Sequence, residues 1–266
     1  MNLLAIESAT NLVGAAVVAG DHGVERSHQG GRRHAESLIP AVEEVCALAG
    51  LTLPDLDAVA VDVGPGLFTG LRVGVATAKA LAQGLGLGVL GVGSLDVLAA
   101  GAREAAAAEA DAPGATTVVS VVDARRGEVF VARYEFGTGA DGTDADADPD
   151  PDAARASGPE LLTPEALAAS LAGIDPGAGG RLVVVGDGAV RYLDRFMGVG
   201  RADLALAEHV SSPSPLTLAR LASRRLAAGG STVPPTAVVP DYRREADARI
   251  NWEQRTPPTP TDPPAP

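Results

Sequence analysis

The chain has 266 residues, a formal net charge of -13 and a pI near 4.7. This acidic balance argues against autonomous binding of nucleic acid, which uses a basic surface. The single cysteine, Cys46, excludes an internal disulfide framework, and no apolar run approaches the roughly 18 residues that span a bilayer, so we expect a cytoplasmic protein that does not enter a membrane.

The first half of the chain alternates apolar strands with amphipathic helices. The predicted order is three strands, then helix, strand, helix, strand and helix, over Leu3–Ile6, Val13–Ala19, Val24–His28, His34–Ala49, Asp57–Val63, Phe68–Gly86, Gly88–Val92 and Ser94–Ala110. Thr69 and Ser94 are expected to cap the last two helices. Three sequential strands followed by such units are typical of the ribonuclease-H-like core.

The helix after the Gly64-Pro65-Gly66 turn carries a small residue at every fourth position, and these residues share one side of the helix. They are Gly70, Gly74, Ala78, Ala82 and Gly86. Each glycine inside a helix lowers the stability of the helix by roughly 1 kcal/mol relative to alanine. We therefore expect these glycines to permit the close approach of another backbone. The stripe predicts the tightest contact in the fold, a docking face, or both. Arg72 lies in the first turn, where the helix dipole disfavours a cation, and it predicts a carboxylate or phosphate partner.

The second half repeats this architecture in part. The predicted elements are two strands, a helix, a strand and a short helix, over Val118–Val122, Val129–Phe136, Pro164–Ala172, Leu182–Val185 and Ala189–Met197. A last helix, Pro215–Ala227, is expected to pack back on the first half. The predicted fold class is α/β, with two ribonuclease-H-like (actin-like) subdomains built on mixed five-stranded sheets.

The domain borders follow from this pattern and from composition. We expect a first subdomain over residues 1–112, a second and degenerate one over 113–208, and a C-terminal helix and strand over 209–254 that pack back on the first. Residues 137–158 are acidic and poor in apolar side chains, which predicts a disordered insertion. The Pro/Thr-rich residues 255–266 predict a disordered tail.

Two turns carry candidate nucleotide-binding residues. Glu7 and Thr10 lie where this fold places its first phosphate loop, although an ordinary strand turn explains them as well. Asp123 holds the equivalent place in the second half, and Gly186 and Gly188 could pass close to a nucleotide. Gly64-Pro65-Gly66 before a helix could bind an anion. No catalytic residue, metal ligand or further cofactor is assigned, because the four histidines form no metal-binding motif and no nucleophile motif is present.

Several segments, occurring in this order, resemble the TsaB (YeaZ) family of bacterial tRNA threonylcarbamoyladenosine biosynthesis. They are IESAT at the N-terminus, HAESLIP from His34, GPGLFTGLRVGVATAKALA from Gly64, GVGSLDVLA from Gly91 and VDARRGEVF from Val122. The resemblance is close over about residues 1–136. It is weaker over 159–250, where PDYRREADARINW resembles the C-terminal strand of the family.

This resemblance implies a non-catalytic scaffold subunit. The family is similar to TsaD, which transfers threonylcarbamoyl to adenosine 37 of tRNA, but Gly93-Ser94-Leu95-Asp96 stands where TsaD carries a metal-binding histidine motif. The implied partners are a TsaD-type transferase, a TsaE-type ATPase and a second copy of the chain, with tRNA contacted only through the complex. The resemblance places the partner contact on the helix pair His34–Ala49 and Phe68–Gly86, as a helical bundle. The expected partner-binding residues are Leu38, Val42, Val45, Gly70, Arg72, Gly74, Ala78 and Ala82.

Two other function classes stay open. An ATPase or phosphotransferase of the actin-like superfold would rest on Glu7, Asp123 and the Gly186–Gly188 turn. A peptidase is the weaker alternative, because the chain shows neither a metal-binding nor a nucleophile motif. Calorimetry with Mg-ATP separates the nucleotide-using enzyme from the scaffold.

Overall fold

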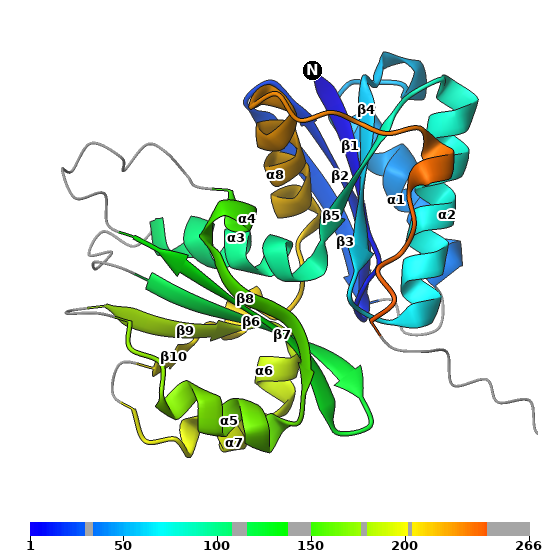
Figure 1. Cartoon of the computed structure of the whole chain (residues 1–266). Coiled ribbons are helices and arrows are strands. Elements are labelled where there is room, and N and C mark those ends of the chain that lie inside the picture. Colours follow the sequence, from blue (N-terminus) through cyan, green and yellow to red (C-terminus); the bar gives the residue numbers. More distant parts are fainter. Residues whose placement is uncertain (30–33, 108–115, 138–149, 177–179, 202–203, 244–266) are drawn as a thin grey trace, which may run out of the picture.

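The computed structural model describes residues 1–29, 34–107, 116–137, 150–176, 180–201 and 204–243. Two five-stranded mixed sheets, each with helices on both faces, form the two subdomains (Figure 1). Over these residues, no helix combines the length and the apolar character needed to cross a membrane.

The first sheet has the strand order β3-β2-β1-β4-β5. Its strands are β1 (Asn2–Glu7), β2 (Leu12–Ala19), β3 (His22–Gln29), β4 (Ala58–Gly64) and β5 (Val89–Gly93). Strands β1, β2 and β3 are antiparallel neighbours, whereas β4 runs parallel to β1 and β5 parallel to β4. The helices α1 (His34–Leu48) and α2 (Phe68–Leu85) cover one face, and α8 (Pro215–Ala227) covers the other (Figure 1). The short η1 (Leu53–Asp55) precedes β4.

The second sheet has the order β10-β9-β6-β7-β8. Read from β8, its strands follow one another in the same pattern as those of the first sheet read from β3, so the two sheets have the same topology. Its strands are β6 (Thr116–Arg125), β7 (Glu128–Phe136), β8 (Arg155–Leu162), β9 (Arg181–Val185) and β10 (Leu204–Leu206). One face packs against α3 (Ser94–Ala107) and α4 (Pro151–Ala154). The other packs against α5 (Pro164–Ala172), α6 (Asp187–Arg191) and α7 (Leu193–Met197).

The two subdomains exchange a helix. Helix α3 follows β5 of the first sheet but packs on the second, and α8 follows β10 and η3 (Glu208–Val210) but packs on the first. The two exchanged helices also contact each other. This arrangement confirms the predicted α/β class, with two ribonuclease-H-like subdomains on mixed five-stranded sheets.

Beyond α8 the chain returns along α2 to the end of β4. Val233 forms an antiparallel bridge with Val89, η4 (Pro235–Ala237) follows, and the amide of Asp241 donates to the carbonyl of Val63 at 2.7 Å. Lys79 Nζ in α2 donates to the carbonyl of Val238 at 3.1 Å. Residues 240–243 do not form the C-terminal strand expected there. The rest of that strand and the 255–266 tail lie outside the described residues.

The acidic insertion expected over 137–158 is shorter than predicted. Its second part forms α4 and the first half of β8, which pairs antiparallel with β7; residues 138–149 lie outside the described part. Strand β8 was overlooked because it is a half-exposed edge strand of sequence RASGPELL, without apolar alternation. The three-residue β10 was overlooked as well, and the single helix expected over Ala189–Met197 is two short helices that meet at Tyr192.

The two predicted helix caps were also wrong. The N-cap of α2 is Leu67, whose side chain makes no capping bond, and Thr69 lies exposed in the first turn. Ser94 is the first residue of α3, and its hydroxyl donates to Asp62 Oδ1 at 2.6 Å.

Candidate functional site

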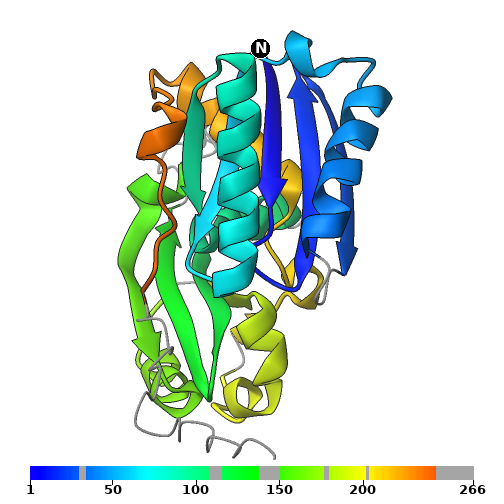
Figure 2. The ribbon, with the colours of Figure 1, turned by 90° about the vertical axis from the view of Figure 1, so that its right-hand side faces the viewer.

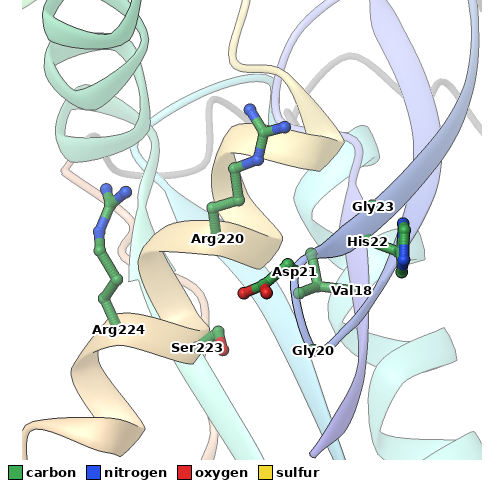
Figure 3. A pocket seen from close by; sticks show the side chains of 8 residues that line it. All are labelled: Val18, Gly20, Asp21, His22, Gly23, Arg220, Ser223 and Arg224. Atoms are coloured by element: carbon green, nitrogen blue, oxygen red, sulfur yellow. The ribbon is translucent and has the colours of Figure 1, made fainter.

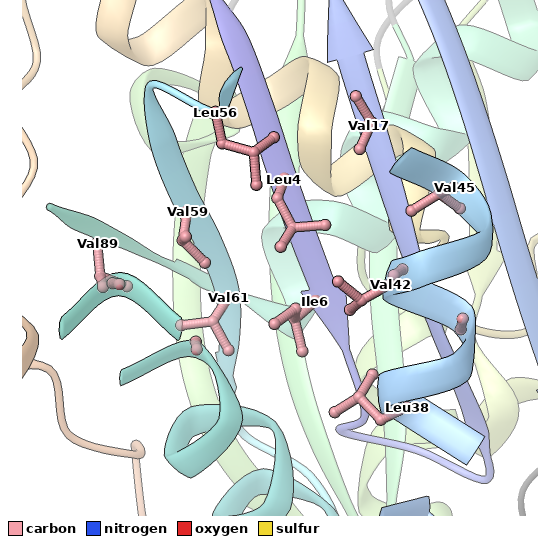
Figure 4. Packing of buried hydrophobic residues seen from close by; sticks show 14 of the residues in the cluster. Leu4, Ile6, Val17, Leu38, Val42, Val45, Leu56, Val59, Val61 and Val89 are labelled. Carbon is pink, nitrogen blue, oxygen red and sulfur yellow. The ribbon is translucent and has the colours of Figure 1, made fainter. Parts of the chain in front are cut away.

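The apolar side chains of α1 lie in the core of the first subdomain. Leu38, Val42 and Val45 are between 0% and 1% exposed. They point toward the sheet and pack in one cluster with Leu4 and Ile6 of β1 (Figure 4). Their assignment as partner-binding residues was therefore wrong, because alternate side chains of β2 and its neighbour β1 present an apolar face that α1 must cover.

The small-residue stripe of α2 also faces its own sheet. Gly70, Gly74, Ala78 and Ala82 are all buried. The Ser8 hydroxyl donates to the carbonyl of Gly70 at 2.9 Å, and a Cβ added at Gly74 would stand 2.1 Å from Ser8 Oγ. The expected close contact thus lies within the chain and is made by the Ser8 side chain and not by another backbone. The assignment of these four residues to a partner face was wrong.

Arg72 is exposed at the start of α2 and contacts aromatic side chains. Its guanidinium lies over the ring of Phe68, 3.8 Å from the centroid, and its Nε donates to the hydroxyl of Tyr242 at 3.2 Å. Phe68 and Tyr242 also contact each other, with ring centroids 4.9 Å apart. The expected acidic partner is replaced by two rings, which suits a planar guanidinium.

The surface that the helix pair presents to solvent is formed by other residues. Helices α1 and α2 lie side by side over the sheet (Figure 2). On α1, the exposed side chains include Ile39, 43% exposed, and Leu48, 49% exposed. We call this surface the outer face; it comprises Glu36, Ile39, Pro40, Glu43, Glu44, Ala47 and Leu48 of α1, and Thr69, Arg72, Ala76, Ala80 and Gln83 of α2.

The candidate nucleotide residues of the first half are both buried: Glu7 is the last residue of β1, and Thr10 lies in the turn that follows. Glu7 is 0% exposed and its Oε1 accepts a hydrogen bond from the amide of Ala9 at 2.7 Å. Thr10 is 1% exposed, and its Oγ1 accepts from the amide of Leu12 at 3.3 Å. Both side chains therefore stabilise the turn itself.

Asp123, the candidate of the second half, lines a cavity of about 270 Å³ between the subdomains. Its Oδ2 accepts from Arg125 Nη1 at 3.0 Å and from Arg191 Nη1 at 3.2 Å. Arg125 also reaches across to the first subdomain, where its Nη2 donates to Asn11 Oδ1 at 3.2 Å. Beside this group, burial raises the pKa of Asp187, whose Oδ1 accepts from the amide of Asp123. The Asp123 charge is thus already neutralised within the chain.

Gly186 and Gly188 allow the start of α6 to pack tightly on β6. Gly186 has φ of 105°, and a Cβ there would stand 2.1 Å from the carbonyl oxygen of Val121. A Cβ at Gly188 would stand 2.7 Å from Cγ1 of the same valine. Packing alone accounts for both glycines.

Sequence reasoning overlooked a buried ionic cluster centred on Asp96 of α3. Asp96 is 3% exposed, and its carboxylate accepts hydrogen bonds from Arg155, from Tyr134 Oη at 2.8 Å and from Arg225 Nη2 at 3.3 Å. Arg225 also binds Asp150 through two bonds of 2.7 Å. Burial raises the pKa of Tyr134, so its hydroxyl stays a donor. This Asp96 cluster ties α3, β7, β8 and α8 together across the two subdomains.

A second buried acid, Asp62 in β4, was also overlooked. It is 0% exposed, and its Oδ1 accepts from the amide of Gly64 at 2.7 Å and from Ser94 Oγ at 2.6 Å. A lone acid inside the β-branched run AVAVDVG was the available signal. Within the described ranges, no group of three or more His, Cys, Asp or Glu side chains is arranged to hold a metal ion.

A further pocket of about 250 Å³ lies between the β2–β3 hairpin and α8 (Figure 3). Arg220 and Arg224 line it, but each is directed to Glu104 of α3 at 3.7 Å. Asp21 and His22 come from the hairpin on the opposite side. These two arginines of α8 therefore form ion pairs with α3.

The comparisons with known proteins agree on one family. The family model of TsaD, tRNA N6-adenosine threonylcarbamoyltransferase, matches residues 25–252. The tRNA threonylcarbamoyladenosine biosynthesis protein TsaB of Escherichia coli is 36% identical over 137 residues, which cover 51% of this chain and 55% of that protein. A tRNA N6-adenosine threonylcarbamoyltransferase of Moorella thermoacetica is 43% identical over 108 residues, 34% of this chain and 32% of that protein.

A solved structure extends the match over both subdomains. A Pseudomonas aeruginosa protein with similarity to peptidase YEAZ superposes with a TM-score of 0.71 at 27% identity, covering 91% of this chain and 99% of that one. The chain spans about half the length of the curated TsaB relatives it matches. The chain belongs to the TsaD family and, within it, to the TsaB (YeaZ) group.

Proposed function

We propose that this chain is a non-catalytic subunit of the machinery that makes threonylcarbamoyladenosine in tRNA. In this proposal it docks a TsaD-type transferase through the outer face of α1 and α2. The family match and the E. coli relative, a tRNA threonylcarbamoyladenosine biosynthesis protein, support the pathway. The docking role is supported by the chemistry of the outer face.

The observation that carries the docking role is the composition of the outer face. Ile39 and Leu48 expose apolar surface on α1, and the α2 side of the face carries Ala76 and Ala80. Small side chains let a partner helix approach closely, while flanking apolar side chains supply the area that must leave water. A helical bundle is the geometry that such a face fits.

The acidic candidates for nucleotide binding already contact other groups of the chain, which favours a scaffold over a nucleotide-using enzyme. Asp123 lies between the guanidinium groups of Arg125 and Arg191, and Glu7 is enclosed beneath the turn that follows β1. A phosphotransferase needs acidic groups that are free to hold its cation at the cleft. In this chain both acids already have structural partners.

Further partners follow from the same face and from the charge of the chain. A second copy could occupy the outer face when the transferase is absent, which gives a homodimer. A TsaE-type ATPase would join the resulting complex at another surface. With a net charge of -13, this subunit is expected to meet tRNA only through its partners.

Reconstitution tests this function. The chain and a TsaD-type transferase of the same organism are purified, supplied with threonylcarbamoyl donor, TsaE-type ATPase and tRNA, and assayed for modified adenosine. We expect no modification by the chain alone and a requirement for it in the complete mixture. Modification by this chain without the transferase would contradict the non-catalytic role, and full activity without this chain would contradict the scaffold role.

A further inference from the structure

Two buried carboxyl groups lie next to each other on neighbouring strands of the first sheet. In the parallel pairing of β1 with β4, Ile6 lies opposite Val61, so Glu7 and Asp62 occupy the next position on each strand. Both are 0% exposed. Because successive side chains alternate between faces, the two carboxyl groups leave the sheet on the same side.

Each carboxyl group has one oxygen that is satisfied and one that is not. Glu7 Oε1 accepts from the amide of Ala9, and Asp62 Oδ1 accepts from Gly64 and Ser94. Glu7 Oε2 and Asp62 Oδ2 are buried without a donor among the described residues. A buried oxygen without a donor loses its hydrogen bonds to water and gains none in return, so two such atoms on adjacent side chains need an explanation.

The charged groups around the pair do not supply a counter-ion. The next acid, Asp96 on α3, adds negative charge, and the nearby cations Arg155 of β8 and Arg225 of α8 bind Asp96. No ion pair within the described ranges reaches Glu7 or Asp62. Two adjacent carboxylates cannot both be ionised in such a site.

We propose that Glu7 and Asp62 share one proton, which Glu7 Oε2 carries and donates to Asp62 Oδ2. This hydrogen bond satisfies both open oxygens and links the ends of β1 and β4 just before the turn that starts α2. Asp62 is the ionised partner because the amide of Gly64 and the hydroxyl of Ser94 already donate to it.

The directions in which the pKa values shift agree with Glu7 as the protonated partner. Burial, followed by the charge of Asp62, raises the pKa of Glu7 well above its usual range. Burial also raises the pKa of Asp62, while the hydrogen bonds from Glu7 and Ser94 oppose that rise. The folded chain therefore holds a proton that the unfolded chain releases near pH 4.3.

The proton makes stability depend on pH with a defined sign. Its stabilisation is complete below the pKa of an unfolded glutamate and is lost as pH rises toward the elevated pKa of the pair. Within that window the equilibrium constant for unfolding increases by up to about tenfold per pH unit for one proton.

Urea unfolding of the full chain from about pH 5 to about pH 9 tests this proposal. The Glu7→Gln variant keeps a donor at the same place without a titrating proton, and Glu43→Gln on the exposed face of α1 is the matched control. We expect the wild type and Glu43→Gln to lose stability with rising pH, and Glu7→Gln to show a slope that is smaller by one proton. Equal slopes for all three proteins would overturn the proposal.

Carbon-13 NMR of the side-chain carboxyl groups gives a second readout that needs no variant at residue 7. In the native chain the Glu7 carboxyl carbon should titrate at a higher pH than a glutamate in an unfolded chain. In Asp62→Asn the new amide donates to Glu7 and removes the neighbouring charge, so Glu7 should titrate lower than in the wild type. A wild-type Glu7 signal that titrates at the pH of a glutamate in an unfolded chain would contradict the shared proton.

Discussion

Gly74 of α2 lies so close to Ser8, the residue after β1, that a Cβ at position 74 would stand 2.1 Å from the serine hydroxyl oxygen. That hydroxyl is held by the carbonyl of Gly70, one turn earlier in the same helix. The missing side chain at 74 is therefore what lets α2 rest on the end of β1. The α2 residues available to a partner are those on the opposite side of this contact.

Two glycine substitutions in α2 should have opposite effects on stability. Gly74→Ala forces Ser8 out of its position and breaks its bond to Gly70, so we expect a loss of about 1–3 kcal/mol in the free energy of unfolding. Gly84→Ala, where no atom lies within 4 Å of the added Cβ, should gain up to about 1 kcal/mol from helix propensity. Chemical denaturation measures both. Equal effects of the two changes would show that the stripe is not a tight contact.

The Asp96 cluster should hold the two subdomains together. Asp96→Ala leaves Arg155, Arg225 and the Tyr134 hydroxyl without their buried acceptor. Removing one partner of a buried ion pair costs about 3–5 kcal/mol. Because Arg155 and Arg225 are partly exposed, we expect a loss near the lower end of that range, measured by thermal or urea unfolding.

The control for Asp96 is an exposed ion pair of the second subdomain. Glu165 and Arg195 are 3.7 Å apart and both are 63% exposed. Exposed pairs contribute about 0–1 kcal/mol, so Glu165→Ala should change stability little. If Asp96→Ala were no more destabilising than Glu165→Ala, the cluster would not be a structural link.

The cavity between the subdomains should not bind Mg-ATP tightly. Asp123 is paired with Arg125 and Arg191, and Arg125 bridges the opening to Asn11. We expect isothermal calorimetry of the full chain with Mg-ATP to show no micromolar binding and an ATPase assay to show no turnover. Micromolar affinity that is lost in Asp123→Asn would instead support the nucleotide-using alternative.

Hydrophobic periodicity predicted α1 and α2 because each of these helices has one clearly apolar face. The same periodicity cannot say what covers that face. Leu38, Val42 and Val45 form a regular helical stripe whether they meet a partner or, as observed, the sheet beneath them. The small residues of α2 were ambiguous for the same reason, since close approach is required in both cases.

Elements without a strong pattern escaped prediction. Strand β8 is an edge strand with half-exposed side chains, and β10 has only three residues. Asp96 lies far in the sequence from Tyr134, Arg155 and Arg225, and only the fold brings it to them. The bond from Ser94 to Asp62 likewise joins distant parts of the chain. Such pairings depend on tertiary contacts that local sequence does not encode.

The affinity of this chain for a TsaD-type transferase of the same organism tests the docking face most directly. Ala76→Arg adds a large charged side chain to the outer face and retains helix propensity, whereas Ala169→Arg makes the same change at an exposed position of α5. Circular dichroism and urea unfolding confirm that both variants fold. We predict that Ala76→Arg raises the Kd by at least about tenfold, equivalent to about 1.4 kcal/mol, and that Ala169→Arg leaves it unchanged. An unchanged Kd for a folded Ala76→Arg variant would contradict docking through the outer face of α1 and α2.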